Sequence, residues 1–261
     1  LVVHLYLLFN AMLRNAFVPN DFCFGMIKPL LKNKHGDQTS LDMYRGITLT
    51  PVLSKLFESV LLALYGTYLT RSSLQYGFKK NSSCNHALFT FVESVKYFTK
   101  RGSKVFCAFL DASKAFDKVL INGLLTKLID RKAPYHLINI LNNWFRNLTC
   151  SVVWNSLIGD SFRVTCGVRQ GGILSPFLFS LYIDDIIEQM KQSGYGIYVG
   201  SHFAGCILYA DDLALVSCSC QALQKLIDIC YFYGIAWDIQ SNSQKSQAIT
   251  FGGNQPYLEL K

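Results

Sequence analysis

The chain has 261 residues, of which 51 % are hydrophobic and 16 % are charged, and this excludes a disordered chain, which needs low hydrophobicity and more charge. The length is near the upper limit for a single hydrophobic core, so we expect one large domain or two lobes. The 25 Lys and Arg residues outnumber the 17 Asp and Glu residues, which leaves a net charge of +8. This excess favours nucleic acid or an anionic membrane surface as the partner, although many solvated surfaces are also basic.

The sequence contains 9 cysteines, an odd number, without a CxxC pair or a cysteine–histidine quartet at zinc spacing. We therefore expect free, mostly buried thiols in a reducing compartment. The apolar opening segment, residues 1–9, is too short to span a bilayer, and it lacks the features of a signal peptide. Because the first residue is not Met, we expect the sequence to be an excerpt of a longer protein that begins inside a helix.

Hydrophobic periodicity predicts a mixture of helices and strands. In chain order, the expected elements are a helix over 1–17, a strand over 22–31, a basic loop over 32–40, helices over 52–69 and 85–100, a strand over 105–110, helices over 122–131 and 134–147, a hairpin of 150–154 with 162–165 around 157–160, a helix over 175–192, strands over 197–199 and 207–216, a helix over 221–237 and a strand over 247–251. Pro51 marks one helix start, and Ser175 as N-cap before Pro176 marks another. This order predicts the α+β class, with an antiparallel sheet and helices packed on one face.

Two adjacent carboxylates, Asp211 and Asp212, follow Tyr209-Ala210 in the middle of an apolar strand pattern over 206–216. Two charges in such a run are costly unless a cation or a tight turn accommodates them. A tight β-turn would expose both side chains, and Asp favours turns. A turn and a cation site are therefore both open interpretations of this segment.

A third carboxylate, Asp111, directly follows the apolar strand predicted over 105–110. If this strand lies beside the hairpin that carries Asp211 and Asp212, three carboxylates can converge. Carboxylate oxygens suit Mg²⁺, which binds through a few of them together with substrate phosphates. Two such ions about 3.5–4 Å apart can clamp the attacking and leaving oxygens of a phosphoryl transfer.

Several segments, taken together, resemble a known family in their order and spacing. They are Tyr44–Leu49, Ser54–Glu58, Gln75–Ser83, Asp111–Asp117, Gly167–Pro176 with its Gln-Gly-Gly-Ile-Leu-Ser-Pro run, Tyr209–Asp212 and Asn242–Ser246. The pattern resembles the reverse transcriptases of non-LTR (LINE-type) retrotransposons of the chicken-repeat and jockey kind. The resemblance extends from about residue 22 to residue 252.

The resemblance implies a right-hand polymerase fold, in which an antiparallel palm sheet is backed by helices and the thumb is absent. Residues 1–103 would form the fingers and amino-terminal helices, and residues 104–261 the palm. Part of residues 134–170 is a candidate to return to the fingers. The longer parent protein would add a thumb and an endonuclease domain.

The implied activity is RNA-directed DNA polymerisation, with two-metal nucleotidyl transfer from a dNTP to a primer 3′-OH. By resemblance, Asp111, Asp211 and Asp212 hold two Mg²⁺ ions, with Mn²⁺ as an alternative, and the carbonyl of Ala112 is an extra ligand. Lys245 matches a lysine that protonates the leaving pyrophosphate, although a plain surface lysine fits the pattern equally well.

Other residues match the nucleotide-binding positions of the family. Phe116 would be the steric gate that excludes a ribonucleotide 2′-OH, although a core phenylalanine under the sheet is the alternative. The remaining candidates are Arg45 and Lys32 for the triphosphate, with Lys34 and Lys28 as rivals in a loop that is otherwise simply solvated, and Gln170 and Gly171 along the nucleotide. Arginine suits bidentate phosphate binding. We expect Asp117 to order a turn or cap a helix.

The template and primer would contact a third set of residues: Lys79, Lys80, Gly172, Ser175, Pro176 and Tyr209. The expected partners are an RNA template, a DNA primer and dNTPs, and no membrane is expected. The resemblance implies a nuclear protein that assembles on RNA in the cytoplasm. One alternative is a decayed, non-catalytic relic that at most binds RNA, and a weaker one is a viral RNA-dependent RNA polymerase, which usually carries another residue at position 116.

Overall fold

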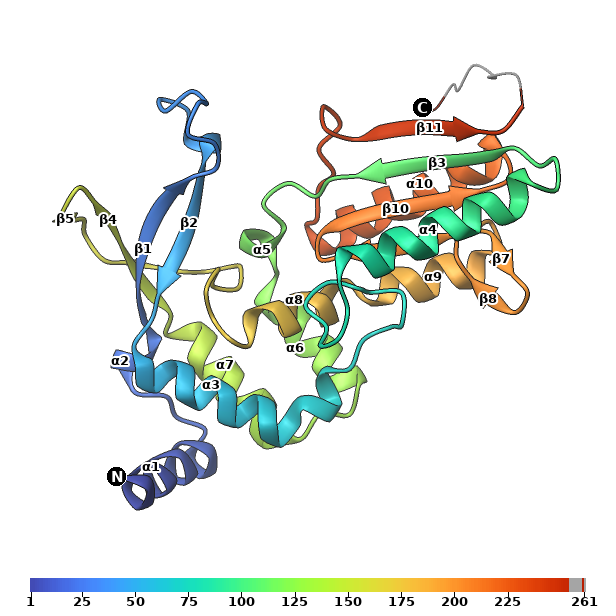
Figure 1. Ribbon diagram of the computed structural model, residues 1–261. Helices are drawn as coiled ribbons and strands as arrows, with labels where there is room; N and C mark the ends of the chain where they lie inside the picture. The colour runs from blue at the N-terminus through green and yellow to red at the C-terminus, as the bar shows by residue number, and fades with distance from the viewer. Residues whose placement is uncertain (254–259, 261) are drawn as a thin grey trace. The chain divides into compact units, whose positions relative to one another are not determined.

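The computed structural model describes residues 1–253 and 260, and Figure 1 shows its helices and strands. The chain forms two compact units. The first contains Leu1–Thr70 and Phe116–Phe179, and the second contains Arg71–Ala115 and Ser180–Lys261. These units are defined by how residues pack, and their limits differ from the predicted boundary between residues 103 and 104. The fingers and the palm are defined by function and not by packing. The predicted division into fingers and palm therefore stays a prediction.

The first unit contains most of the helices of the amino-terminal half and one mixed sheet. Its helices are α1 (Val2–Asn15), α2 (Asn20–Cys23), α3 (Val52–Tyr65), α6 (Ile121–Asp130) and α7 (Tyr135–Arg146), with 3-10 turns η1 (Leu41–Met43) and η2 (Gly66–Leu69). Its strands are β1 (Phe24–Leu31), β2 (Tyr44–Leu49), β4 (Thr149–Trp154), β5 (Leu157–Ile158) and β6 (Phe162–Arg163). Two helices, α5 (Ala115–Lys118) and α8 (Ser175–Ile183), contain two of the three points at which the chain passes between the units, and the third lies between Thr70 and Arg71.

The sheet of the first unit has the strand order β2-β1-β4-β5, with β6 also paired to β4. Strands β1 and β2 are antiparallel, whereas β1 and β4 are parallel. The predicted hairpin around 157–160 turns earlier than expected. Trp154 pairs with Leu157, and Asn155 and Ser156 form the turn with φ of 45° and 69°. Positive φ at both central residues is typical of a two-residue hairpin turn.

Aromatic rings fill the core of the first unit. Phe57 of α3 is fully buried, and its ring centroid lies 5.0 Å from that of Phe9 and 5.6 Å from that of Trp144. The ring of Phe22 meets Phe57 edge to face at 6.4 Å. Such pairs bury large areas and add specific ring geometry. They join α1, α2, α3 and α7 around one centre.

The second unit is built on an antiparallel sheet. Its strands β3 (Val105–Leu110), β9 (Cys206–Tyr209), β10 (Asp212–Ser217) and β11 (Gln247–Phe251) follow the order β11-β3-β10-β9. Its helices are α4 (Cys84–Thr99), α9 (Asp185–Ser193) and α10 (Cys220–Trp237), and a small hairpin joins β7 (Tyr198–Val199) to β8 (His202–Phe203). The α+β class and the antiparallel sheet are confirmed.

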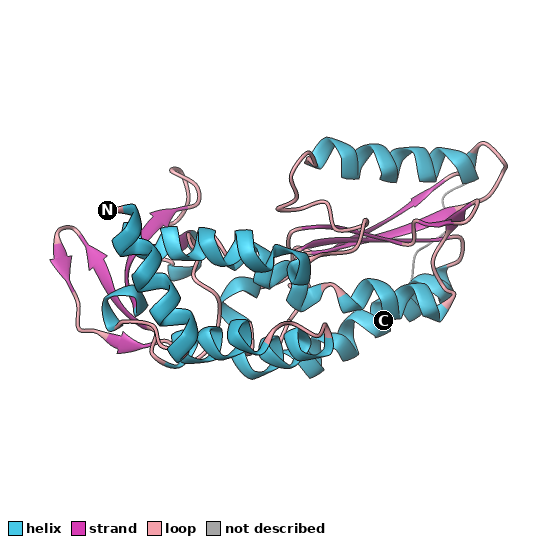
Figure 2. Ribbon diagram, turned by 90° about the horizontal axis from the view of Figure 1, so that it is seen from below, coloured by secondary structure: helices cyan, strands magenta, loops and turns pink. Residues whose placement is uncertain are grey.

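Helices cover both faces of this sheet, and not one face as predicted (Figures 1 and 2). On one face, Val95 of α4 belongs to a buried cluster with Cys107 of β3. On the other face, Ala108 and the α10 residue Cys230 line one cavity. Because alternate residues of a strand point to opposite faces, Cys107 and Ala108 face different helices. Both faces of β3 are apolar, and this pattern already indicates burial on both sides.

The helix predicted over 175–192 is interrupted. Helix α8 ends at Ile183 and α9 begins at Asp185. At Asp184 the backbone forms bonds of the tighter i to i+3 kind, from Asp184 N–H to the Leu181 carbonyl and from Ile187 N–H to the Asp184 carbonyl. The Asp184 carboxylate also accepts a hydrogen bond from the backbone N–H of Ser72 at 2.8 Å. The hydrophobic periodicity of residues 175–192 could not predict this contact, because its partner is 112 residues away.

The remaining predicted elements are confirmed to within a few residues, whereas α2, β2, α5 and β8 were not predicted. All cysteines are free thiols, and five of the 9 are buried, as expected: Cys23, Cys107, Cys150, Cys206 and Cys230. Within the described residues, one segment, Val52–Leu69, has the length and apolar composition to cross a membrane. Core helices of soluble proteins pass the same test, and Phe57 and Leu61 of this segment are fully buried.

Candidate functional site

The carboxylates Asp211 and Asp212 lie at the tip of the β9–β10 hairpin. Tyr209 pairs with Asp212 in the register of the two strands, so Ala210 and Asp211 form a two-residue turn. Ala210 has a positive φ of 59° and is almost fully buried. The tight-turn interpretation is therefore correct for the backbone. It does not exclude a cation site, because the turn presents its carboxylates at the end of the sheet.

Asp111 lies next to Asp212. Leu110 is the last residue of β3 and pairs with Leu213 of β10, so Asp111 occupies the next position, opposite Asp212. The pKa of Asp212 is raised, first by partial burial and second by the negative charge of Asp111. The predicted approach of the β3 end to the hairpin is thus observed for this pair of carboxylates.

The full set of three carboxylates does not form a closed cage. Within residues 1–253 and 260, no three His, Cys, Asp or Glu side chains gather in a way that could hold a metal ion. Like charges repel one another, so a close triad is unfavourable without a cation between its members. The donor chemistry nevertheless fits a hard divalent ion, because the burial and the neighbouring Asp111 charge that raise the pKa of Asp212 would be offset by a positive charge beside it.

Lys245 lies beside Asp111. Its ammonium nitrogen is 3.8 Å from Asp111 Oδ2, and its side chain is 63 % exposed. The backbone holds the lysine-bearing loop to the end of β3, since Asn242 N–H donates to the Asp111 carbonyl at 2.7 Å. An exposed pair at this distance contributes little stability. Its importance lies in its position, which places a proton donor at the predicted metal ligand.

Ala112 forms an isolated antiparallel bridge with Ser241. The two hydrogen bonds of this bridge use the carbonyls of Asp111 and Gln240, as Asn242 N–H and Ser113 N–H donate to them. The bridge therefore leaves the Ala112 carbonyl out of its pairing. Its assignment as a metal ligand stays a prediction.

Basic residues share one face of the β1–β2 hairpin in the first unit. Lys28 pairs with Ile47 and Leu30 pairs with Arg45, and side chains directly opposite each other lie on the same face. Residues two apart along a strand point to the same face, so Lys28, Leu30 and Lys32 share one face of the hairpin. Arg45 lies opposite Leu30 and therefore projects from that face too. All three basic side chains are exposed. The structure thus groups the predicted triphosphate residues, apart from Lys34, which lies in the loop after β1.

Lys32 has a local partner as well. Its ammonium donates to the Asp42 carbonyl at 2.8 Å, and its backbone N–H donates to the Met43 carbonyl at 2.8 Å. These bonds close the β1–β2 loop. Lys79 and Lys80, which were predicted to meet the template, are exposed in the loop before α4 in the second unit.

The segment 167–175 of the first unit packs tightly against its neighbours. Thr48 N–H donates to the Gln170 carbonyl at 2.7 Å. Gly171 has a φ of 120°, and a Cβ there would lie 2.6 Å from the Thr48 carbonyl oxygen. A Cβ at Gly172 would lie 2.6 Å from Ser175 Oγ. Gly171 is therefore required by the fold itself, whereas the nearest atom to a Cβ at Gly172 belongs to the Ser175 side chain.

The Gln170 side chain has a partner in α5. Its amide donates to Asp117 Oδ1 at 3.0 Å. This bond is different from the turn or cap expected for Asp117. It fixes the orientation of Gln170, and it runs beside a second link in which Val168 N–H donates to the Phe116 carbonyl at 2.8 Å.

Phe116 stacks on a fully buried ring. Its centroid lies 4.4 Å from that of Phe179 of α8, with an angle of 20° between the ring planes. The ring of Phe116 is only partly buried. One face of the Phe116 ring is thus fixed by packing, as expected for a core phenylalanine. Part of the side chain stays accessible, as expected for a steric gate.

A buried ion pair holds the same segment, and sequence reasoning missed it. Glu58 of α3 is 3 % exposed, and its Oε1 lies 3.4 Å from Arg169 Nη2, while its Oε2 accepts from Leu174 N–H at 2.8 Å. The Arg169 guanidinium also lies over the Trp144 ring at 5.5 Å. Burial lowers the pKa of Arg169, and Glu58 acts against this shift. The signal was present, because both residues belong to segments quoted for the family resemblance.

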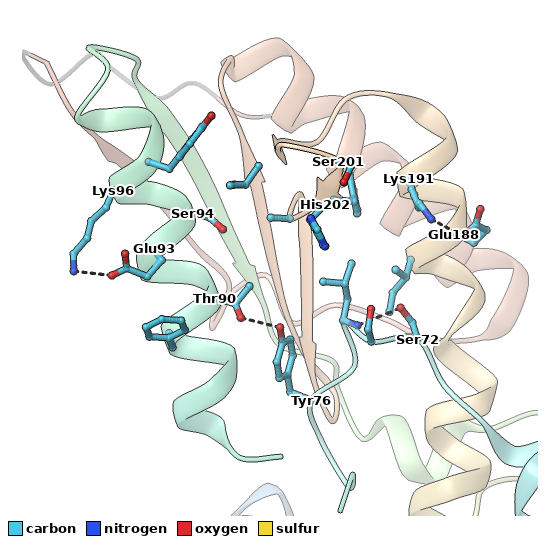
Figure 3. A pocket seen from close by; sticks show the side chains of 18 of the residues that line it. Ser72, Tyr76, Thr90, Glu93, Ser94, Lys96, Glu188, Lys191, Ser201 and His202 are labelled. Atoms are coloured by element: carbon cyan, nitrogen blue, oxygen red, sulfur yellow. Dashed lines mark hydrogen bonds and ion pairs between the residues drawn. The ribbon is translucent and has the colours of Figure 1, made fainter. Parts of the chain in front are cut away.

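A cavity of about 900 Å³ lies elsewhere in the second unit (Figure 3). It is lined by α4, α9, the β7–β8 hairpin and residues 72–76, and Tyr76 is hydrogen-bonded to Thr90 across it at 2.8 Å. Ion pairs lie at its rim, Lys96 with Glu93 and Lys191 with Glu188. None of the predicted catalytic or nucleotide-binding residues lines it. The carboxylates, and not the cavity, define the candidate site.

A carboxylate pair lies at the ends of neighbouring antiparallel strands, in a sheet covered by helices, as the family resemblance predicts for a polymerase palm. The sequence pattern of the family described as reverse transcriptase (RNA-dependent DNA polymerase) matches residues 32–258. The chain therefore belongs to the reverse transcriptase family.

Relatives from transposons support this assignment. The chain is 28 % identical over 262 residues to a probable RNA-directed DNA polymerase from transposon X-element of Drosophila melanogaster, and the match covers 96 % of this chain and 28 % of the relative. It is 27 % identical over 264 residues to the RNA-directed DNA polymerase from mobile element jockey of Drosophila funebris, with the same two coverages, 96 % and 28 %. The chain thus spans little more than a quarter of the length of these relatives.

Solved structures show the same fold. Apo telomerase from Candida tropicalis, truncated from its C-terminal domain, matches with a TM-score of 0.62 at 14 % identity, covering 98 % of this chain and 56 % of the telomerase chain. The telomerase structure without that truncation matches with a TM-score of 0.64 at 13 % identity, covering 87 % of this chain and 44 % of the other. At these identities the likeness concerns the fold alone, and it confirms the predicted reverse transcriptase architecture.

Proposed function

We propose that this chain is the polymerising part of an RNA-directed DNA polymerase of a non-LTR retrotransposon. The observation that carries the proposal is the position of Asp111 beside Asp212 at the ends of β3 and β10, in a chain that belongs to the reverse transcriptase family. The substrates would be dNTPs, an RNA template and a DNA primer. Membership of the family and the transposon relatives support this choice.

Divalent metal dependence is general for reverse transcriptases, and we propose two Mg²⁺ ions, replaceable by Mn²⁺, as the cofactors. Asp111, Asp211 and Asp212 would hold them, with the Ala112 carbonyl as an added ligand. When bound, such ions lower the pKa of the primer hydroxyl and neutralise charge on the leaving pyrophosphate. The carboxylates supply hard oxygen donors, and their mutual repulsion favours a cation.

The protein's own residues would do the rest of the work. Lys245 would deliver a proton to the pyrophosphate from beside Asp111. Arg45 and Lys32 would bind the triphosphate from one face of the β1–β2 hairpin, with Lys28 as the rival on that face. Gln170, Gly171 and Phe116 would position the base and sugar of the nucleotide.

The template and primer would meet a further group of residues. We assign Tyr209 to the primer terminus, and the backbone near the start of α8 to the template. The residues of this group are Lys79, Lys80, Gly172, Ser175, Pro176 and Tyr209. From the family alone, we propose that the protein acts in the nucleus after assembly on RNA in the cytoplasm, which imaging of the tagged protein in cells would test.

Primer extension tests the function directly. The chain, in its full natural sequence context, should extend a DNA primer on an RNA template with dNTPs and Mg²⁺. Asp211→Asn should abolish extension, because the variant loses a charged metal ligand. Asp160→Asn, which changes an exposed carboxylate in the β5–β6 loop of the first unit, is the matched control and should extend normally.

The outcome separates the alternatives. Equal extension by wild type and Asp211→Asn would remove the assigned metal site. A wild-type protein that binds RNA in a gel-shift assay but does not extend the primer would favour the relic or scaffold interpretation.

Phe116→Val tests the gate. Removing the ring should raise the incorporation of ribonucleotides relative to deoxynucleotides, measured as the ratio of kcat/KM for the two sugars. Because the ring also stacks on Phe179, Phe179→Leu is the control for lost packing. It should destabilise the protein without an equal change in sugar preference. An unchanged ratio in Phe116→Val would assign this ring to the core alone.

A further inference from the structure

Gln75 is a polar residue buried without any exposed surface, in the loop before α4. Its side chain reaches the catalytic hairpin, 135 residues further along the chain. The amide nitrogen donates to the Ala210 carbonyl at 3.2 Å, and the amide oxygen accepts from Ala210 N–H at 3.1 Å. The same oxygen accepts from Gly77 N–H at 2.9 Å. One side chain therefore satisfies both backbone groups of Ala210.

The backbone around Gln75 extends the sheet beside β9. Tyr76 N–H donates to the Leu208 carbonyl at 2.8 Å, and Leu208 N–H donates to the Leu74 carbonyl at 2.9 Å. Gln75 thus pairs with Leu208 in a parallel bridge. The side chain of Gln75 then bonds to Ala210, two residues after Leu208, in the turn where the backbone pairing ends.

The backbone of Ala210 needs such support. Its φ of 59° lies in the left-handed region, which residues with a Cβ rarely adopt. Gly77 approaches this residue so closely that a Cβ on the glycine would lie 2.1 Å from Ala210 N. One loop therefore packs against the turn at Ala210 through the amide of Gln75 and through Gly77, where the missing side chain permits the close approach.

We propose that Gln75 is a positioning residue that holds the Tyr209–Asp212 turn in the geometry required for catalysis. The amide fixes the N–H and the carbonyl of Ala210, and these set the direction in which the chain enters Asp211. Glutamine suits this role because it offers a donor and an acceptor on one planar group. The catalytic part of this inference rests on the proposed polymerase function, whereas the structural part does not.

Two variants of Gln75 separate the donor from the acceptor. Gln75→Met keeps the length of the side chain and removes both hydrogen-bonding groups. Gln75→Glu keeps an acceptor for Ala210 N–H and Gly77 N–H and loses the donor to the Ala210 carbonyl. Gly77→Ala attacks the same turn from the backbone side. Ser54→Ala is the matched control, because Ser54 is also fully buried and its hydroxyl bonds to the Phe22 carbonyl, in the other unit.

The first measurement is amide hydrogen exchange, which needs no activity. In Gln75→Met, exchange at Ala210 and its neighbours in residues 209–212 should accelerate at least about tenfold, because the bond that protects Ala210 N–H is lost. Exchange in α10 and in β3 should stay at the wild-type rate. Gln75→Glu should give an intermediate acceleration. Ser54→Ala should leave the turn unchanged.

The second measurement is steady-state primer extension by the same proteins. A misplaced turn should lower kcat by about 10²-fold in Gln75→Met and Gly77→Ala, while the KM for dNTP stays within about twofold, because the nucleotide contacts are elsewhere. Mn²⁺ binding, followed by electron paramagnetic resonance, should also weaken in Gln75→Met and Gly77→Ala.

The outcomes are distinct. Unchanged exchange over 209–212 in both Gln75 variants would overturn the proposal, and so would an acceleration spread equally over the whole second unit, which would indicate a general loss of stability. Normal kcat with accelerated exchange would overturn the catalytic part. An inactive wild type would refute the polymerase function and leave the exchange result as the test of the turn.

Discussion

Two loops of this protein carry its functional motifs, and each is held by a buried polar side chain from a distant segment. In the second unit, the neutral amide of Gln75 holds the turn at Ala210. In the first unit, the charged pair of Glu58 and Arg169 holds the 169–174 segment, with Leu174 N–H bound to the carboxylate. Each loop also involves a close backbone approach at a glycine: Gly77 lies against the turn at Ala210, and Gly171 of the 169–174 segment lies against Thr48.

The two devices differ in their energetics. The hydrogen bonds of a buried amide offset the cost of removing it from water. When the amide is lost, its backbone partners are left unsatisfied but carry no charge. A buried ion pair is costly to desolvate, and its attraction roughly offsets this cost. Removing one partner leaves an uncompensated charge in the core. The ion pair therefore makes the first unit more vulnerable to single substitutions, although the pair as a whole adds little net stability.

The largest expected effect comes from breaking the ion pair. Glu58→Ala should lower the free energy of unfolding by about 3–5 kcal/mol, because Arg169 stays buried without its counter-charge. Chemical denaturation followed by circular dichroism measures this change. Replacing both residues in a Glu58→Met, Arg169→Met protein is the matched control and should recover most of the lost stability. A double variant as unstable as Glu58→Ala would assign the loss to the hydrogen bond that the Glu58 carboxylate accepts from Leu174 N–H, and not to the unpaired charge.

The next effect concerns the backbone of the same loop. Gly171→Ala should cost about 1–3 kcal/mol, since its φ of 120° is unfavourable for alanine and the new Cβ would meet the Thr48 carbonyl at 2.6 Å. Thermal unfolding measures the loss. Gly102→Ala is the control, because Gly102 also has a positive φ, 81°, but no atom lies within 4 Å of a Cβ placed there. An equal loss at both sites would assign the effect to φ alone and not to contact with β2.

The last effect is absent near neutral pH and develops only in alkaline solution. Burial raises the pKa of Cys23 to about 11 and that of Cys107 to about 12 from the ordinary value of 9.0. The folded protein thus keeps protons that the unfolded chain releases above pH 9, so stability should fall from pH 9 upward until each folded pKa is reached. The fall is at most about 1.4 kcal/mol per pH unit for each thiol.

The buried thiols of the two units differ in the charges that act on their pKa values. Arg169 lowers the pKa of Cys23 and Cys150 against the effect of burial, whereas Cys107 and Cys206 of the second unit receive only effects that raise it. Among buried cysteines, Cys23 and Cys150 should therefore react first with iodoacetamide as pH rises, as peptide mass spectrometry would show. Exposed Cys84 should react well before both. Earlier reaction of Cys107 would contradict the assigned influence of Arg169.

Much of the fold could be predicted from the sequence because its cues are local. Apolar periodicity placed α3, α4, α10 and β3 correctly, and the apolar strand ending at Asp111 indicated its approach to the hairpin. Long-range pairings left no such signal. Nothing in the local pattern of Phe24–Leu31 reveals the parallel pairing with β4, and the bond from Ser72 that accompanies the break at Asp184 comes from 112 residues away.

The candidate site shows the same limit. Motif spacing identified Asp111, Asp212 and Gln170, which the structure places beside Asp212, Asp111 and Asp117 respectively. It could not identify the side chains that hold these motifs in place. Gln75 and Glu58 belong to segments that carry the family resemblance, but their buried partners become apparent only once distant segments are brought together in the fold.

The strand order of the second unit has a consequence for synthesis on the ribosome. Strand β3 ends at Leu110, but its neighbours β10 and β11 begin at Asp212 and Gln247. At about 5–20 residues per second, roughly 5–20 s pass before the first of these partners emerges. During this interval the apolar β3 segment has no strand to pair with. The sheet of the second unit therefore forms late, and we expect early packing of α4 on β3 to shorten the time for which this apolar segment is exposed.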